Sequence, residues 1–242
     1  MNTQKNWDTS IMTKFNSWPS GRLPTNFQRP ELEQVRQLGY EWSDPRDVVG
    51  IFERKVAEFA GSRYAVAVDC CTNGVFLCLK YVQASGQIEI PKHTYQSIPM
   101  NIMHAGCTPV FRQEEWSGMY QLRPYDIWDA ATRWRRGMYR GGLHVCSFQI
   151  KKRVPIGRGG MILTDDYEAY QWLDKARYDG RDLSVSQWED DGDICGWHMY
   201  MTPEDAARGI MLMDQVPEDN PDCGGWDNYA DLSQKKLFKN LI

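Results

Sequence analysis

Apolar and polar positions follow different patterns on either side of residue 46. Residues 1–45 are rich in Asn, Pro, Ser, Arg and Trp and have no sustained period, which predicts an irregular N-terminal arm with a short helix around Glu31–Leu38. Beyond Asp44, apolar residues recur at helical spacing until Gly61, which predicts a helix that opens a compact domain. The apolar residues of this helix are Val48, Phe52, Val56 and Phe59.

Short β-branched runs then alternate with helical segments as far as residue 216. This alternation is typical of βαβ units, so we expect an α/β domain over residues 46–216 with a mainly parallel sheet flanked by helices. The expected strands are Tyr64–Val68, Ile88–Ile90, Pro109–Phe111, Ile127–Asp129, Leu143–Phe148 and Met161–Leu163. The expected helices are Val75–Tyr81, Ser97–Ala105 and Tyr167–Arg177.

The chain changes character after one further predicted helix. Thr202 followed by Pro203 is typical of an N-cap with proline in the first turn, and this helix is expected to run through Met213. After Val216 the sequence is polar and rich in Gly and Pro, which predicts a short C-terminal tail over residues 217–242.

The composition is that of an ordinary globular protein: of 242 residues, 42% are hydrophobic and 25% charged, with a net charge of −4. Dedicated nucleic-acid binders usually carry a basic surplus, so this balance favours small-molecule partners. No apolar run approaches the ~20 residues of a membrane span, and no signal peptide is evident, so we expect a cytoplasmic protein. The seven cysteines include no C-x-x-C pair and the four histidines lack metal-ligand spacing, which indicates reduced thiols and no metal site.

Candidate functional residues follow the predicted strands, where α/β sheets bind their ligands. The turn that contains Cys71 and Thr72 opens a helix, and its amides and hydroxyl either hold an anion or act as ordinary caps. Asp129 ends an apolar strand and needs a cationic or N–H partner, which is either a protonated cofactor ring nitrogen or an Arg salt bridge. Tyr95 is either a packing residue or a platform for a cofactor ring.

A basic triplet, Lys151-Lys152-Arg153, follows the strand that ends near Ser147. It is either a solvated loop or a source of a partly desolvated amine that can act as a Schiff-base nucleophile. The nearby Gly157–Gly160 turn does not match a P-loop and precedes a strand, which disfavours a nucleotide-phosphate cradle.

From about Val48 to Met213, the ordered motifs resemble the DegT/DnrJ/StrS family of pyridoxal-phosphate-dependent nucleotide-sugar aminotransferases. The matching segments are Phe59–Val68, Cys71-Thr72, Pro91-Lys92-His93-Thr94-Tyr95, Asp129-Ala130-Ala131, Ser147-Phe148 with Lys152, Gly157–Asp166 and Arg177–Arg181. The resemblance implies the large domain of the type I transferase fold, a three-layer α/β/α arrangement with a mainly parallel central sheet. It also implies a homodimer with a shared active site.

The resemblance assigns roles residue by residue. Lys152 is expected to form a Schiff base with pyridoxal 5'-phosphate and to shuttle a proton, with Lys151 as the competing lysine. Asp129 is expected to pair with the pyridinium nitrogen, and Tyr95 to stack on the ring. Cys71, Thr72 and Ser147 are expected to hold the phosphate. The implied reaction moves an amino group from L-glutamate to a keto sugar, expected to be nucleotide-linked, as in polysaccharide biosynthesis.

The sequence also departs from the family pattern. Cys71 stands where the family has glycine, and Thr132 where it usually has Gln or His near the cofactor. Family members usually continue for well over a hundred residues after the equivalent of the Thr202–Met213 helix, whereas this sequence has about thirty. An alternative hypothesis is therefore a catalytically degenerate PLP- or sugar-binding accessory or regulatory protein of the same fold.

Overall fold

The computed structural model describes residues 29–239. The expected N-terminal arm falls largely on residues 1–28 and so lies outside the described residues. The short helix predicted at its end is present as α2 (Pro30–Gln37), and the helix predicted to open the domain is α3 (Asp47–Ala60). As expected, α3 ends at Gly61, whose left-handed φ of 82° is readily adopted only by glycine.

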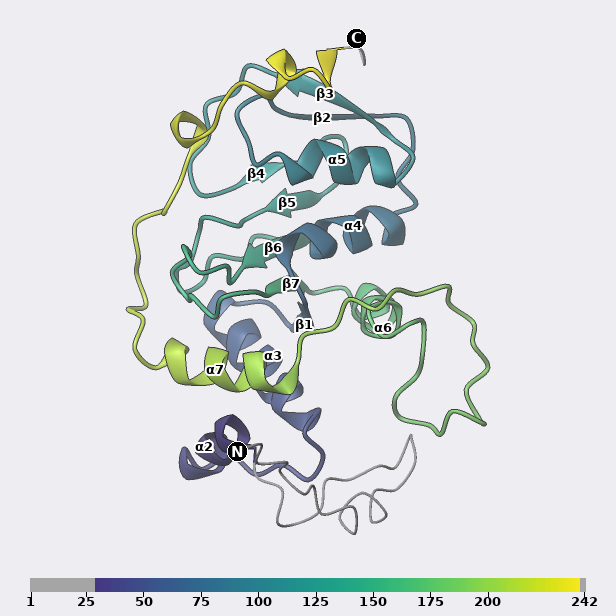
Figure 1. The fold of residues 1–242 in the computed structure, drawn as a ribbon, viewed down its shortest axis with the longest axis vertical. Coiled ribbons are helices and arrows are strands. Elements are labelled where there is room, and N and C mark those ends of the chain that lie inside the picture. Colours follow the sequence, from purple (N-terminus) through teal and green to yellow (C-terminus); the bar gives the residue numbers. More distant parts are fainter. Residues whose placement is uncertain (1–28, 240–242) are drawn as a thin grey trace, which may run out of the picture.

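Two sheets form the framework (Figure 1). The larger sheet has five strands in the order β1-β7-β6-β5-β4, and β2 pairs with β3 in a separate two-stranded sheet. The strands are β1 (Tyr64–Val68), β2 (Gln87–Pro91), β3 (Thr108–Arg112), β4 (Tyr120–Gln121), β5 (Ile127–Asp129), β6 (Leu143–Ser147) and β7 (Gly160–Thr164). Every predicted strand is present, and β4 is an additional short strand.

The prediction of a mainly parallel sheet is wrong, because the larger sheet is mixed. Only β5 and β6 pair in parallel, whereas β7 runs antiparallel to both β1 and β6, and β4 is antiparallel to β5. The cause lies in the connections. A parallel pair needs a long crossover, usually a helix, whereas β6 and β7 are joined by residues 148–159, which contain no helix. All five residues of β7 are buried, so its apolar run looks the same as that of a parallel strand.

Helices cover both faces of the larger sheet, in three layers as expected (Figure 1). One face packs against α4 (Cys71–Tyr81), α5 (Ser97–His104) and α6 (Tyr167–Ala176), and the other against α3 and α7 (Pro203–Met213). The alternation of β1 explains this: Ala65 and Ala67 belong to the core beneath α3 and α7, and Val66 and Val68 to the core beneath the other helices.

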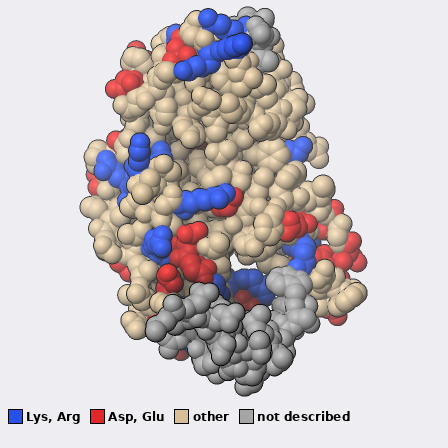
Figure 2. Space-filling view, in the orientation of Figure 1, with Lys and Arg blue, Asp and Glu red and all other residues tan. Residues whose placement is uncertain are grey.

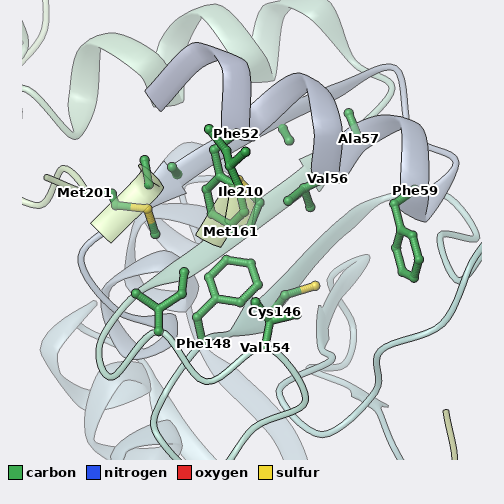
Figure 3. Packing of buried hydrophobic residues seen from close by; sticks show 14 of the residues in the cluster. Phe52, Val56, Ala57, Phe59, Cys146, Phe148, Val154, Met161, Met201 and Ile210 are labelled. Carbon is green, nitrogen blue, oxygen red and sulfur yellow. The ribbon is translucent and has the colours of Figure 1, made fainter. Parts of the chain in front are cut away.

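The core beneath α3 and α7 anchors the start of the loop between β6 and β7, which carries Lys151 and Lys152 (Figure 3). Phe148 follows β6 directly, and its ring lies 5.3 Å from that of Phe52 on α3. Ile210 of α7 and Met161 of β7 complete this packing, and all four side chains are essentially inaccessible to solvent. Removing a buried phenylalanine ring typically costs about 3–5 kcal/mol, so Phe148 fixes the position of the loop that begins after it.

Residues 217–239 leave α7 and run along one edge of the domain to the β2–β3 sheet (Figure 1). We call them the C-terminal segment. They form two short turns, η1 (Trp226–Asn228) and η2 (Leu232–Gln234). The Asp222 carboxylate holds the segment to the domain through ion pairs with Arg133 (2.7 Å) and Arg135 (2.9 Å). The predicted tail therefore packs on the domain over its described length.

The surface and the helix lengths bear on possible partners. On the face shown in Figure 2, the Lys and Arg side chains of the described residues form small separate groups, several of them beside Asp or Glu, and no continuous basic patch. Within residues 29–239, no helix has both the length and the apolar character needed to cross a bilayer.

Candidate active site

A cavity of about 670 Å³ lies where β5 and β6 end and α4 begins. Its volume is in the range of small-molecule and cofactor sites. All the residues predicted from sequence line it together, although they come from four separate parts of the chain. They are Cys71, Thr72, Tyr95, Asp129, Ser147 and Lys152, and the competing Lys151 lines it as well.

Asp129 ends β5 at the base of this cavity and is only 5% exposed. Its Oδ1 accepts a hydrogen bond from Ala131 N (2.9 Å) and its Oδ2 accepts one from the Tyr120 hydroxyl (2.8 Å). Among residues 29–239 no Arg or Lys forms an ion pair with this carboxylate. Burial raises the pKa of Asp129, and the two hydrogen bonds and the charge of Lys152 act against that rise. A plain Arg salt bridge, one of the two alternatives, is therefore not what balances it.

Tyr120 was not predicted as a site residue, yet it orients Asp129. It lies in the two-residue strand β4 next to β5, and its hydroxyl also contacts the buried Thr94 hydroxyl. Burial, and next the negative charge of Asp129, raises the pKa of Tyr120 well above its usual value, so the phenol stays protonated and can donate to the carboxylate. No motif marks this tyrosine, because its role depends on strand pairing.

We expect Tyr120→Phe to weaken the charged form of Asp129 while leaving the fold intact. Loss of the donor raises the pKa of Asp129 further, so the carboxylate takes up a proton at a higher pH. As the pH is lowered, the variant should therefore lose its affinity for a cationic ligand group at a higher pH than wild type does. The binding free energy should weaken by about 1–3 kcal/mol. The measurement is ligand affinity against pH; an unchanged acid limb would contradict this role.

The loop between β6 and β7 presents the two candidate lysines. Phe148 exchanges backbone hydrogen bonds with Gly159 (3.0 Å) and Gly157 (3.1 Å), which closes the loop at its base. At its apex Lys152 N donates to Gln149 O (2.8 Å). The Lys152 side chain is half-buried and acts electrostatically on both Asp129 and Cys71, whereas Lys151 is exposed. These observations favour Lys152 as the reactive amine.

The first turn of α4 faces the same cavity from the other side. Cys70 is its N-cap, and Cys70 Sγ accepts a hydrogen bond from Asn73 N (3.4 Å). The Thr72 hydroxyl is hydrogen-bonded to the Ser97 hydroxyl (2.9 Å), and both residues line the cavity with Ser147. Hydroxyls and the first amides of a helix form a favourable environment for an anion.

Cys71 occupies the place of the family glycine without obstructing this turn. Its Sγ is directed to the Val145 carbonyl on β6 (3.7 Å), on the sheet side of the helix. The backbone of this turn instead lies close to the backbone of Gly160 at the start of β7. A Cβ at Gly160 would lie 2.6 Å from Cys71 N. Burial raises the pKa of the Cys71 thiol well above its usual value, so the thiol stays neutral.

Thr132, which the motif comparison places near the cofactor, forms a wall of the cavity together with the C-terminal segment, which no motif indicated. The Thr132 hydroxyl is within hydrogen-bonding distance of the carbonyls of Gly118 (3.0 Å) and Gly224 (2.9 Å), so its proton is directed to backbone rather than to a ligand. The segment contributes four residues to the lining: Cys223, Gly224, Asn228 and Tyr229. Tyr95 also lines the cavity and is 60% exposed, so its ring is accessible from solvent.

Comparison with known proteins agrees with these features. Residues 28–137 match the model of the DegT/DnrJ/EryC1/StrS aminotransferase family. The chain is 34% identical to the spore coat polysaccharide biosynthesis protein SpsC of Bacillus subtilis (strain 168), over 78% of this chain and 62% of SpsC. The chain thus spans less than two thirds of the length of this relative.

Solved structures share the fold. DesI, whose crystal structure was determined in the presence of its TDP-sugar product, superposes with a TM-score of 0.60 at 22% identity, over 78% of this chain and 58% of DesI. Spr1654 of Streptococcus pneumoniae in its PLP form has a TM-score of 0.62 at 17% identity, over 80% of this chain and 66% of Spr1654. At these identities the likeness shows the fold alone.

Proposed function

We propose that the chain is a pyridoxal-phosphate-dependent aminotransferase of the DegT/DnrJ/EryC1/StrS aminotransferase family, whose model matches residues 28–137. It transfers an amino group from L-glutamate to a keto sugar, with a nucleotide-linked sugar as the expected acceptor. The observation that carries this proposal is that the half-buried Lys152 and the buried Asp129 line one cavity. The Asp129 carboxylate forms no ion pair with an Arg or Lys among residues 29–239.

The cavity fits pyridoxal phosphate at each end. Asp129, buried and held by two hydrogen bonds, suits a protonated ring nitrogen, because a buried carboxylate without a cation is costly. The first turn of α4, with Thr72, Ser97 and Ser147, suits the phosphate. Lys152 suits the aldehyde, since the loop that carries it is closed at its base and brings its amine to the same cavity.

When bound, pyridoxal phosphate supplies an aldehyde for covalent capture of amines and a conjugated ring that accepts an electron pair. The protein binds, orients and moves protons. Lys152 holds the cofactor and then uses Nζ to take and return the α-proton of the amino donor. Asp129 keeps a positive charge at the ring nitrogen, and Tyr120 maintains its orientation. Tyr95, an exposed residue of the cavity lining, would stack on the ring.

The proposal includes a homodimer with a shared site and a cytoplasmic location. The exposed ring of Tyr95 supports the first, because a second copy would cover it. An accessory protein that binds only a sugar would place no requirement on Lys152 and Asp129, which nevertheless meet in one cavity. No observation on the described residues favours that alternative.

The experiment is a spectral titration of the purified full chain. Incubation with pyridoxal phosphate should produce a visible absorption band, and L-glutamate should convert it to the amine form of the cofactor and remove the visible band. A band that does not respond to glutamate or to other amino donors would favour the accessory-protein alternative. A chain that acquires no visible band would contradict both the aminotransferase and the PLP-binding form of the alternative. D-glutamate, which places the α-proton on the opposite face, is the control.

A further inference from the structure

The C-terminal segment runs along one edge of the domain (Figure 1), and contacts at three places along it hold it beside the cavity. Asp222 is bound by two arginines, the Gly224 carbonyl is bound by the Thr132 hydroxyl, and Leu232 N donates to Lys92 O (2.8 Å). Gly118, with a φ of +75°, permits the first contact, because a Cβ there would lie 2.3 Å from an Asp222 oxygen. Ion pairs and backbone hydrogen bonds therefore hold the segment in place, and the cavity-lining side chains of Asn228 and Tyr229 are not needed for this.

Two of those lining side chains carry polar atoms without a hydrogen-bond partner among the described residues. Asn228 Oδ1 accepts from Gly225 N (2.9 Å), which fixes the amide and leaves its Nδ2 unpaired. Tyr229 is fixed by the hydrogen bond between its carbonyl and His93 Nδ1 (2.9 Å), and its ring stacks on Trp116 with centroids 5.8 Å apart. Its hydroxyl has no partner within residues 29–239.

Tyr229 lines the same cavity as Asp129 and Cys71. Burial, and next the negative charge of Asp129, raises the pKa of Tyr229 to about 12, with Cys71 and Tyr95 also contributing. Because Tyr229 lines the cavity together with Asp129 and Thr72, it lies alongside the proposed cofactor site. It remains protonated near neutral pH and is a neutral hydrogen-bond donor.

We propose that Asn228 and Tyr229 contact pyridoxal phosphate directly, so that the C-terminal segment is part of the cofactor site. This inference rests on the proposed function. Thr132 is hydrogen-bonded to backbone and offers no proton to a ligand, and the segment that it binds supplies two neutral donors in its place. A purely structural segment would need neither the Tyr229 hydroxyl nor the Asn228 Nδ2, because backbone atoms and Asp222 already hold it.

The test measures the affinity of the full chain for pyridoxamine 5'-phosphate, which cannot bond covalently to Lys152 and so reports the non-covalent contacts alone. Tryptophan fluorescence provides the signal, since Trp116 lines the cavity. Tyr229→Phe keeps the ring stack and Asn228→Ala removes the amide; each should raise Kd about 3–10-fold, the value of one hydrogen bond. Ser233→Ala is the matched control, since it removes a hydroxyl of the same segment that binds Asp231 outside the cavity.

The outcomes separate this inference from the function on which it rests. Weaker binding in both variants with an unchanged control supports it, and weaker binding in one assigns the contact to that residue alone. Wild-type binding with neither variant affected overturns the inference and leaves the proposed function standing. A wild-type chain that binds neither pyridoxamine phosphate nor pyridoxal phosphate overturns both. Thermal unfolding midpoints equal to wild type exclude misfolding as the cause of any loss.

Discussion

Lys152→Ala is expected to lose covalent retention of the cofactor and to lower the rate of the glutamate half-reaction by at least about 10²–10⁴-fold, the usual contribution of a general acid–base group. The loss should be larger still if covalent capture also limits the rate. The fold should persist, because Phe148, Val154 and Ile156, rather than the lysine, anchor the loop in the core. The measurement is single-turnover absorbance after mixing the cofactor-loaded protein with L-glutamate.

Lys151→Ala is the matched control, because it removes the same charge from the neighbouring position of the same loop. We expect it to retain the visible band and a half-reaction rate within a few-fold of wild type, since Lys151 is exposed and Lys152 is the lysine that acts on Asp129. If Lys151→Ala abolished the band and Lys152→Ala retained it, the two lysines would have to exchange roles.

Asp129→Asn is expected to have the second largest effect. The substitution preserves shape but removes the charge proposed to pair with the ring nitrogen, and loss of one partner of a buried charge pair costs about 3–5 kcal/mol. The half-reaction should therefore slow by about 10²–10⁴-fold at saturating cofactor. Stability should not fall, because a buried carboxylate is replaced by a neutral amide that can still hydrogen-bond to Tyr120.

The control for this substitution is Asp126→Asn, which neutralises an exposed carboxylate just before β5. Asp126 accepts a hydrogen bond from Trp128 Nε1 (2.7 Å) and does not line the cavity. Asp126→Asn should leave the rate of the glutamate half-reaction unchanged. A rate for Asp129→Asn equal to that of this control would show that Asp129 is not a cofactor contact.

Local sequence signals predicted the elements of this fold well. The Thr202–Pro203 start of α7 appears as expected, with the Thr202 hydroxyl accepting from Asp205 N (3.2 Å), because a cap and its helix are neighbours in sequence. The direction of β7 relative to its neighbouring strands could not be predicted from local sequence. A run of five buried apolar residues is compatible with either direction, and the outcome depends on the connection, which places β7 beside β6 without a crossover.

The candidate site shows the same division. Asp129, Ser147 and Lys152 stand in recognisable motifs at strand ends, and the structure brings them to one cavity. Tyr120 and Tyr229 carry no such signal. Tyr120 reaches Asp129 through the pairing of β4 with β5, and Tyr229 reaches the cavity after a polar stretch that follows α7. Both depend on contacts between distant parts of the chain, which spacing alone does not encode.

The central claim is that this cavity holds pyridoxal phosphate through Lys152. The most direct measurement is borohydride reduction of the cofactor-loaded full chain, followed by proteolysis and mass spectrometry of the peptide that contains both lysines. Fragmentation distinguishes the neighbouring residues. We predict that the reduced pyridoxyl group is found on Lys152 in stoichiometric amount. Its location on Lys151 or elsewhere, or its absence after incubation with excess cofactor, would contradict the account.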